Sequence, residues 1–203
     1  MSQQPFHQPS PRTRKLISLF LVSGSLFWLP ALFPAPYALF PAVAQTTQDR
    51  KAEAEKLLQT GVQQYRQSKF REALESFQQA LVVFQQLKDR KSEGTTLNNI
   101  GLVYHKLGQY PKALEFYQQA LAIRKEVGNR AGEGTTLNNL GLVYDNLGQY
   151  PKALEFYQQA LAILKQVGDR KSEGTTLNNI GEVYRSLGQY PKALEFYQQA
   201  LAI

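Results

Sequence analysis

The sequence predicts an all-α fold in which tandem helix-turn-helix repeats stack into an α-solenoid. Three observations support this prediction. A 31-residue segment that begins at Glu93 recurs from Glu133 and again from Glu173, so the chain repeats every 40 residues. Apolar residues within each copy have the i, i+3, i+4, i+7 spacing of one helix face. Glycine and proline recur at the points where one helix would end and the next begin.

Residues 1–44 differ from the repeats and have the layout of a secretory signal peptide. Three cations between residues 12 and 15 precede an apolar run over residues 16–33, and the small residues Ala42 and Ala44 follow. We therefore expect cleavage directly after Ala44 and export to the periplasm, a lumen or the exterior. The alternative is an uncleaved protein that residues 16–33 anchor in the membrane.

Composition limits the functions open to the mature chain. Removing the three leader cations from the formal charge of +7 leaves +4, with no basic block among the repeats. Such a mild, dispersed charge is not typical of a protein that binds nucleic acid or an anionic membrane surface. The chain has no cysteine, so packing alone stabilises the fold and neither a disulfide nor a thiol nucleophile is available.

Each repeat is expected to contain two helices joined by a tight turn. Gly108 suits the left-handed conformation that ends a first helix, and Pro111 suits the first turn of the second helix. The predicted core face of the first helix consists of Leu97, Ile100, Gly101, Tyr104 and Leu107. Gly101 is expected to allow close approach of the second helix, so a larger side chain there should destabilise the fold.

The second helix presents an apolar face of its own and stops near Gly128. Asn129, and Asp89 and Asp169 at the matching positions, can then cap the helix that follows. The predicted core face of this helix consists of Ala113, Leu114, Tyr117, Ala120 and Leu121. A more divergent copy precedes the three similar ones. The domain over residues 45–203 therefore holds four repeats, at about residues 54–87, 94–127, 134–167 and 174–203, the last of them truncated.

These residue patterns resemble the tetratricopeptide repeat. The matching positions in the first of the similar copies are Leu97, Ile100, Gly101, Tyr104, Ala113, Tyr117 and Ala120. The resemblance implies a right-handed superhelix whose first helices line a concave groove. The 40-residue repeat with its T-L-N-N segment is similar to that of kinesin light chains, and the N-terminal region resembles secreted cyanobacterial proteins that join such repeats to a caspase-like CHAT domain.

The three similar copies differ at only four places within the 31-residue segment, and three of these places lie on the stripe opposite the core. The resemblance implies that this stripe, with its asparagine pairs, faces a bound peptide, whose main chain the amides could contact. The alternative is that the asparagines bridge neighbouring repeats. The predicted groove residues are Asn98, Asn99, Leu102, His105, Lys106, Asn138, Asn139, Leu142, Asp145, Asn146, Asn178, Asn179, Glu182, Arg185 and Ser186.

The sequence favours a non-catalytic scaffold with a protein or peptide partner, no cofactor and no small-molecule substrate. His105 is the only histidine left after removal of the leader, so neither a metal site nor a catalytic acid–base pair is expected. Tetratricopeptide repeats that bind chaperone tails hold two carboxylates with a clamp that includes Lys and Asn. Leu58 and Val62 stand at those positions here, which disfavours a chaperone tail as the ligand. Two alternatives stay open: a regulatory arm of a larger CHAT protease, and an array that self-associates through the uncapped last repeat.

Overall fold

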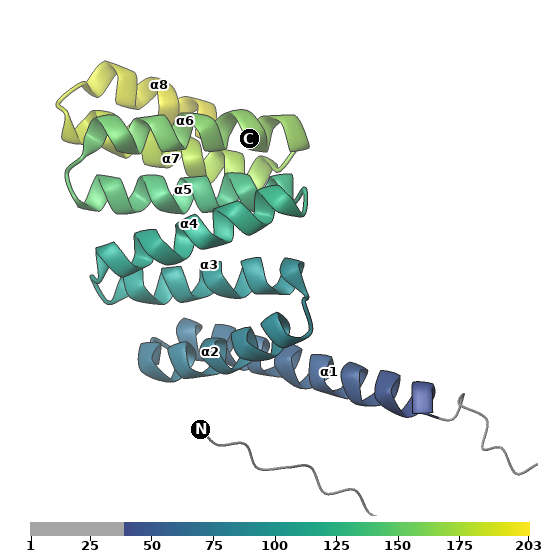
Figure 1. The fold of residues 1–203 in the computed structure, drawn as a ribbon. Coiled ribbons are helices and arrows are strands. Elements are labelled where there is room, and N and C mark those ends of the chain that lie inside the picture. Colours follow the sequence, from purple (N-terminus) through teal and green to yellow (C-terminus); the bar gives the residue numbers. More distant parts are fainter. Residues whose placement is uncertain (1–38) are drawn as a thin grey trace, which may run out of the picture. The chain divides into compact units, whose positions relative to one another are not determined.

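The computed structural model describes residues 39–203. Within this range the chain forms eight helices and no strand, stacked in chain order (Figure 1), which confirms the predicted all-α solenoid. The helices are α1 (Leu39–Arg66), α2 (Phe70–Gln86), α3 (Arg90–Lys106), α4 (Tyr110–Glu126), α5 (Arg130–Asn146), α6 (Tyr150–Val167), α7 (Arg170–Ser186) and α8 (Tyr190–Leu201). Each odd-numbered helix pairs with the next to form one repeat.

The predicted leader lies largely outside the described residues, including its cations and its apolar run over residues 16–33. Helix α1 begins at Leu39, ahead of the expected cleavage point after Ala44. None of the helices within residues 39–203 is both long and apolar enough to cross a membrane. Signal-peptide cleavage and the alternative anchor therefore remain predictions.

The turns between helices follow the predicted chemistry. Gly108 has a φ of 70° after α3, and Pro111 lies in the first turn of α4. Asn129 begins α5 by accepting a hydrogen bond from the backbone N–H of Gly132 at 2.9 Å. Asp89 and Asp169 cap α3 and α7 in the same way. The predicted cap residues are thus confirmed.

The interior of each repeat has a close contact between a glycine and an aromatic ring, which is Phe77 in the first repeat and a tyrosine in the other three. A Cβ atom added at Gly101 would lie 2.6 Å from Cδ1 of Tyr117, well inside van der Waals contact. Gly141 has the same relation to Tyr157, which is fully buried. One predicted core residue is wrong: Leu107 is 37% exposed, because it follows the last residue of α3 and the chain turns away there.

The contacts between helices define an inner and an outer side of the solenoid. The first helices α1, α3, α5 and α7 each contact the next first helix along the chain. The backbones of the second helices approach those of first helices and do not come into contact with one another. The backbones of the first helices therefore come closer together than those of the second helices, and we call the side formed by the first helices the inner side.

One cation is buried where α4 meets α5. Arg124 is 7% exposed, and its Nη1 donates to the carbonyl of Gly132 at 2.6 Å and to Oγ1 of Thr136 at 2.5 Å. Its Nε has no hydrogen-bond partner within the described part of the chain, and burial lowers the Arg124 pKa to about 10. The matching positions in the neighbouring repeats hold the fully buried apolar residues Phe84 and Leu164.

Candidate functional site

The inner face of α3, α5 and α7 carries the residues that the sequence assigned to a groove. The structure divides them into two groups along each helix. The asparagines lie in the middle of each helix and are largely covered by the neighbouring repeat, whereas the varied positions lie near its C-terminal end and are more accessible. The two groups have different surroundings, so their possible roles differ.

The asparagines form hydrogen bonds between successive repeats. Nδ2 of Asn139 donates to Oδ1 of Asn98 at 3.1 Å, and Nδ2 of Asn179 donates to Oδ1 of Asn138 at 3.0 Å. Asn98 and Asn138 are buried, while Asn178 is exposed. This arrangement corresponds to the bridging role that the sequence left as the alternative to peptide contact. An amide that holds two repeats together has less hydrogen-bonding capacity left for a ligand.

Asn99 lacks the hydrogen bond that its counterparts Asn139 and Asn179 make. The acceptor in the preceding repeat would stand 40 residues before Asn98, and this position is Leu58. Within residues 39–203 the half-buried side chain of Asn99 makes no hydrogen bond, so both its donor and its acceptor are available. The first interface between repeats therefore differs from the next two.

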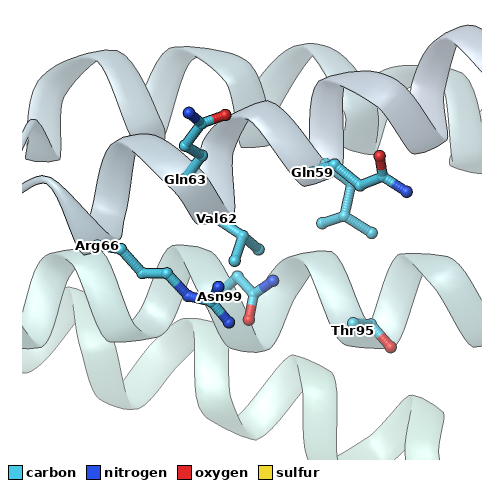
Figure 2. A pocket seen from close by; sticks show the side chains of 7 residues that line it. Gln59, Val62, Gln63, Arg66, Thr95 and Asn99 are labelled. Atoms are coloured by element: carbon cyan, nitrogen blue, oxygen red, sulfur yellow. The ribbon is translucent and has the colours of Figure 1, made fainter.

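A pocket of about 470 Å³ opens beside Asn99, between α1 and α3 (Figure 2). Figure 2 shows Val62 on α1 pointing into the pocket and Arg66 reaching from α1 toward Asn99. The lining residues are Leu58, Gln59, Val62, Gln63, Arg66, Thr95 and Asn99. An adjoining hollow of about 160 Å³ shares Val62, Arg66 and Asn99 and adds Tyr65, Phe77 and Leu102. The two hollows therefore adjoin one another along these shared residues.

The groove becomes more polar toward the C-terminal repeats. A hollow of about 170 Å³ between α5 and α7 is lined only by Thr135, Asn138, Asn139, Ser172 and Thr175. Apolar side chains thus contribute to the first hollow and not to this one. The sequence placed Leu58 and Val62 at groove positions but used them only to disfavour one ligand, and Arg66 was missed. Arg66 stands 40 residues before Lys106, so the same offset predicts it on the inner face.

The varied positions form a mixed polar surface. Nε2 of His105 lies 2.7 Å from Nδ2 of Asn146. Glu182 pairs with Arg185 at 2.6 Å and accepts a hydrogen bond from the hydroxyl of Tyr197 at 2.7 Å. Leu102 and Leu142 are half-buried at the position matching Glu182, while Lys106 and Ser186 are exposed.

His105, Asp145 and Glu182 have shifted pKa values. Burial, and secondarily the charge of Lys106, lowers the pKa of His105. Burial, followed by the negative charge of Glu182, raises the pKa of Asp145. The hydrogen bond from Arg185 lowers the pKa of Glu182. Both signs of charge are present, so this part of the inner face has no single-sign field.

We expect the Asp145→Asn variant to be more stable than the wild type at neutral pH and to lose this advantage in acid. Folding raises the Asp145 pKa, so its contribution favours folding below its ordinary value of 3.8 and is lost as the pH rises through the folded-state pKa. Solvent screening limits the gain at pH 7 to below about 1 kcal/mol. Urea unfolding at pH 7 and pH 4 measures this difference in stability.

Glu182→Gln is the control and should be less stable than wild type at pH 7, because the Glu182 pKa is lowered. An Asp145→Asn gain that is the same at both pH values would contradict this prediction.

Within residues 39–203, no cluster of three or more His, Asp or Glu side chains could hold a metal ion. Glu93, Glu133 and Glu173 are buried, but each pairs with the arginine three residues before it. Each of these glutamates is therefore already engaged in an ion pair within its helix and is not a free acid–base group.

Comparisons with known proteins agree with this geometry. The tetratricopeptide-repeat family model matches residues 54–126 and 127–203. No curated protein sequence matches the chain. Similar solved structures include aspartyl phosphate phosphatase F from Bacillus subtilis, with a TM-score of 0.72, 20% identity, and coverage of 75% of this chain and 40% of that one. BtubC (BKLC) from P. vanneervenii has a TM-score of 0.64 and 24% identity, with coverage of 82% and 73%.

A Rap protein complexed with competence and sporulation factor is also similar, with a TM-score of 0.67 and 20% identity. The match covers 74% of this chain and 42% of that protein. At these identities the likeness is one of fold. The chain spans less than half the length of the phosphatase and of this Rap protein.

Proposed function

Because the chain belongs to the tetratricopeptide-repeat family, we propose that it is a non-catalytic scaffold that binds a peptide or protein partner along the inner face of its first helices. The observation that carries the proposal is the open groove beside Asn99, where a free amide and apolar side chains remain accessible. Concave sites of this size with a few polar groups are typical binding sites.

The distribution of differences among the repeats supports the same proposal. The copies that begin at Glu93, Glu133 and Glu173 are nearly identical, yet three of their four varying positions fall on the inner face. The fourth, Ile100 and its equivalents, is a buried exchange between Ile and Leu. Differences confined to an accessible face alter what the surface can contact without altering how the repeats pack.

We further propose that the scaffold acts outside the compartment of synthesis, after removal of residues 1–44. The order of cations, apolar run and small residues supports export. N-terminal sequencing of the protein recovered from the exported fraction tests this proposal, and a sequence that begins at Gln45 is expected. Recovery of the intact Met1 end from membranes would instead favour the anchored form.

Two asparagine variants separate ligand contact from structural bridging. Asn99→Ala removes an amide with no hydrogen bond, so stability should stay within about 0.5 kcal/mol of wild type. Affinity should nevertheless fall by about 3- to 10-fold, the effect of one lost hydrogen bond. Asn139→Ala removes the donor to the buried Asn98, so its free energy of unfolding should fall by about 1 kcal/mol.

The measurements are thermal unfolding and fluorescence anisotropy with labelled peptides selected on the wild-type protein from a random library. Unchanged affinity of Asn99→Ala for every selected peptide would remove the amide from the proposed binding surface. Failure of the wild-type protein to select any peptide would count against peptide binding as the function.

A further inference from the structure

We propose that the pocket between α1 and α3 binds an extended peptide segment of a partner protein in which an aliphatic side chain lies within two residues of an Asp or Glu. This inference rests on the proposed scaffold function and assigns the chemistry of one position in the groove. It is argued from the apolar wall, the free amide and the charge of this pocket.

The apolar wall of the pocket consists of Leu58, which stands where later repeats have asparagine, and Val62, which matches Leu102. Leu58 stands where the next two repeats have Asn98 and Asn138, and Val62 lies one turn further along α1. Both are half-buried and line the same side of the pocket. An aliphatic side chain placed there would remove further apolar surface from water, a gain that the Thr- and Asn-lined hollow between α5 and α7 does not offer.

The free amide of Asn99 suits the main chain of an extended segment. A backbone unit between two peptide bonds presents one N–H and one C=O, and the Asn99 amide has a matching acceptor and donor. The adjoining hollow continues past Asn99 to Leu102 and Tyr65, so a chain can run on beyond the pocket. This continuity favours an internal segment over a chain terminus as the occupant.

Arg66 sets the charge preference. It is exposed, lines both hollows, and makes no ion pair within residues 39–203. Neither hollow has an Asp or Glu among its lining residues, all of which belong to the described part of the chain. A carboxylate on the ligand would therefore meet an unpaired guanidinium, whereas a ligand lysine would meet an uncompensated like charge.

The test is selection of peptides from a random displayed 12-residue library on the full protein and on two variants. Arg66→Glu reverses the charge of an exposed side chain. Leu58→Asn is the matched control, because it supplies Asn99 with the acceptor that Asn139 finds in Asn98. Circular dichroism first establishes that each variant keeps the helical content of wild type.

We expect wild-type protein to enrich peptides in which Leu, Ile or Val lies within two residues of Asp or Glu. Arg66→Glu should instead enrich Lys or Arg at that position, and Leu58→Asn should lose the aliphatic preference. A selected peptide should bind Arg66→Glu about 3- to 10-fold more weakly than wild type, as expected for an exposed ion pair replaced by repulsion. The same peptide with its Glu changed to Lys should recover affinity for Arg66→Glu.

Identical selection by all three proteins would place the peptides elsewhere on the inner face and overturn this inference while leaving the scaffold function intact. Enrichment of a C-terminal carboxylate, or of basic residues on the wild type, would also overturn it. Selection of no peptide by the wild type would refute both the inference and the proposed function.

Discussion

Gly141→Ala is expected to lower the free energy of unfolding by about 1–3 kcal/mol, as overpacking of a dense core does. The new methyl carbon would lie 2.6 Å from Cδ1 of Tyr157 and 2.7 Å from its Cε1. The Tyr157 ring is fully buried and rigid, so it cannot swing aside as the end of a flexible chain would. Urea unfolding followed by circular dichroism measures the loss.

Gly174→Ala is the matched control for this effect. Gly174 also lies within a first helix, but the nearest atom to an added Cβ is 3.7 Å away, an ordinary contact distance. Alanine favours a helix interior over glycine by about 1 kcal/mol, so this variant should be slightly more stable than wild type. If both variants lose stability equally, helix–helix approach is not what requires glycine at position 141.

Arg124→Leu is expected to stabilise the protein by about 1–3 kcal/mol, because it removes a buried cation that no carboxylate neutralises. Leu164 occupies the matching position one repeat later and is fully buried, so this site is known to accept leucine in the same fold. The lowered pKa of Arg124 has the same cause, namely removal of its charge from water. Thermal and urea unfolding measure the gain.

The hydrogen bonds released by this substitution have an alternative arrangement within the same chain. Thr136 Oγ1 already donates to the Gly132 carbonyl at 3.1 Å, and Thr176 makes the same bond to the Ser172 carbonyl at 2.8 Å one repeat later, where leucine replaces the arginine. No acceptor is therefore left unpaired by Arg124→Leu. A variant less stable than wild type would show that the Arg124 hydrogen bonds outweigh the cost of its burial.

Gly132→Ser tests whether this glycine accommodates Arg124. The neighbouring repeats have Ser92 and Ser172 at this position, and an added Cβ at Gly132 would lie 2.7 Å from Nδ2 of the capping Asn129 and 3.0 Å from Cδ of Arg124. The serine should therefore be tolerated better when Arg124 is already leucine. A double-mutant cycle measures that coupling, and additive effects would separate the two positions.

Helix hairpins could be predicted from the sequence because their determinants are local. Gly108, Pro111 and Asn129 act within a few residues of themselves, so their roles follow from position in the repeat. Leu107 was misplaced because helical periodicity was extended one residue past the end of α3. Burial at a helix end depends on where the chain turns, which a spacing pattern does not encode.

The hydrogen bonds between repeats were harder to predict, because they depend on which residues of one repeat lie opposite those of the next. The same asparagine type is bonded at position 139 and free at position 99, and the difference lies in residue 58, on another helix. Arg124 could be identified from the sequence as a departure from Phe84 and Leu164, but its burial without a carboxylate required the packing of α4 on α5. A site built by adjacent copies is thus visible only once those copies are placed side by side.

The separation of the second helices from one another has a mechanical consequence. Bending that brings the second helices together meets no backbone contact between them, whereas bending in the opposite sense presses the first helices, which already touch, against one another. The stack should therefore bend more readily in the sense that opens its inner side than in the sense that closes it. Ligands of different girth could then be accommodated by small rotations shared over several repeats, with no single joint unfolding.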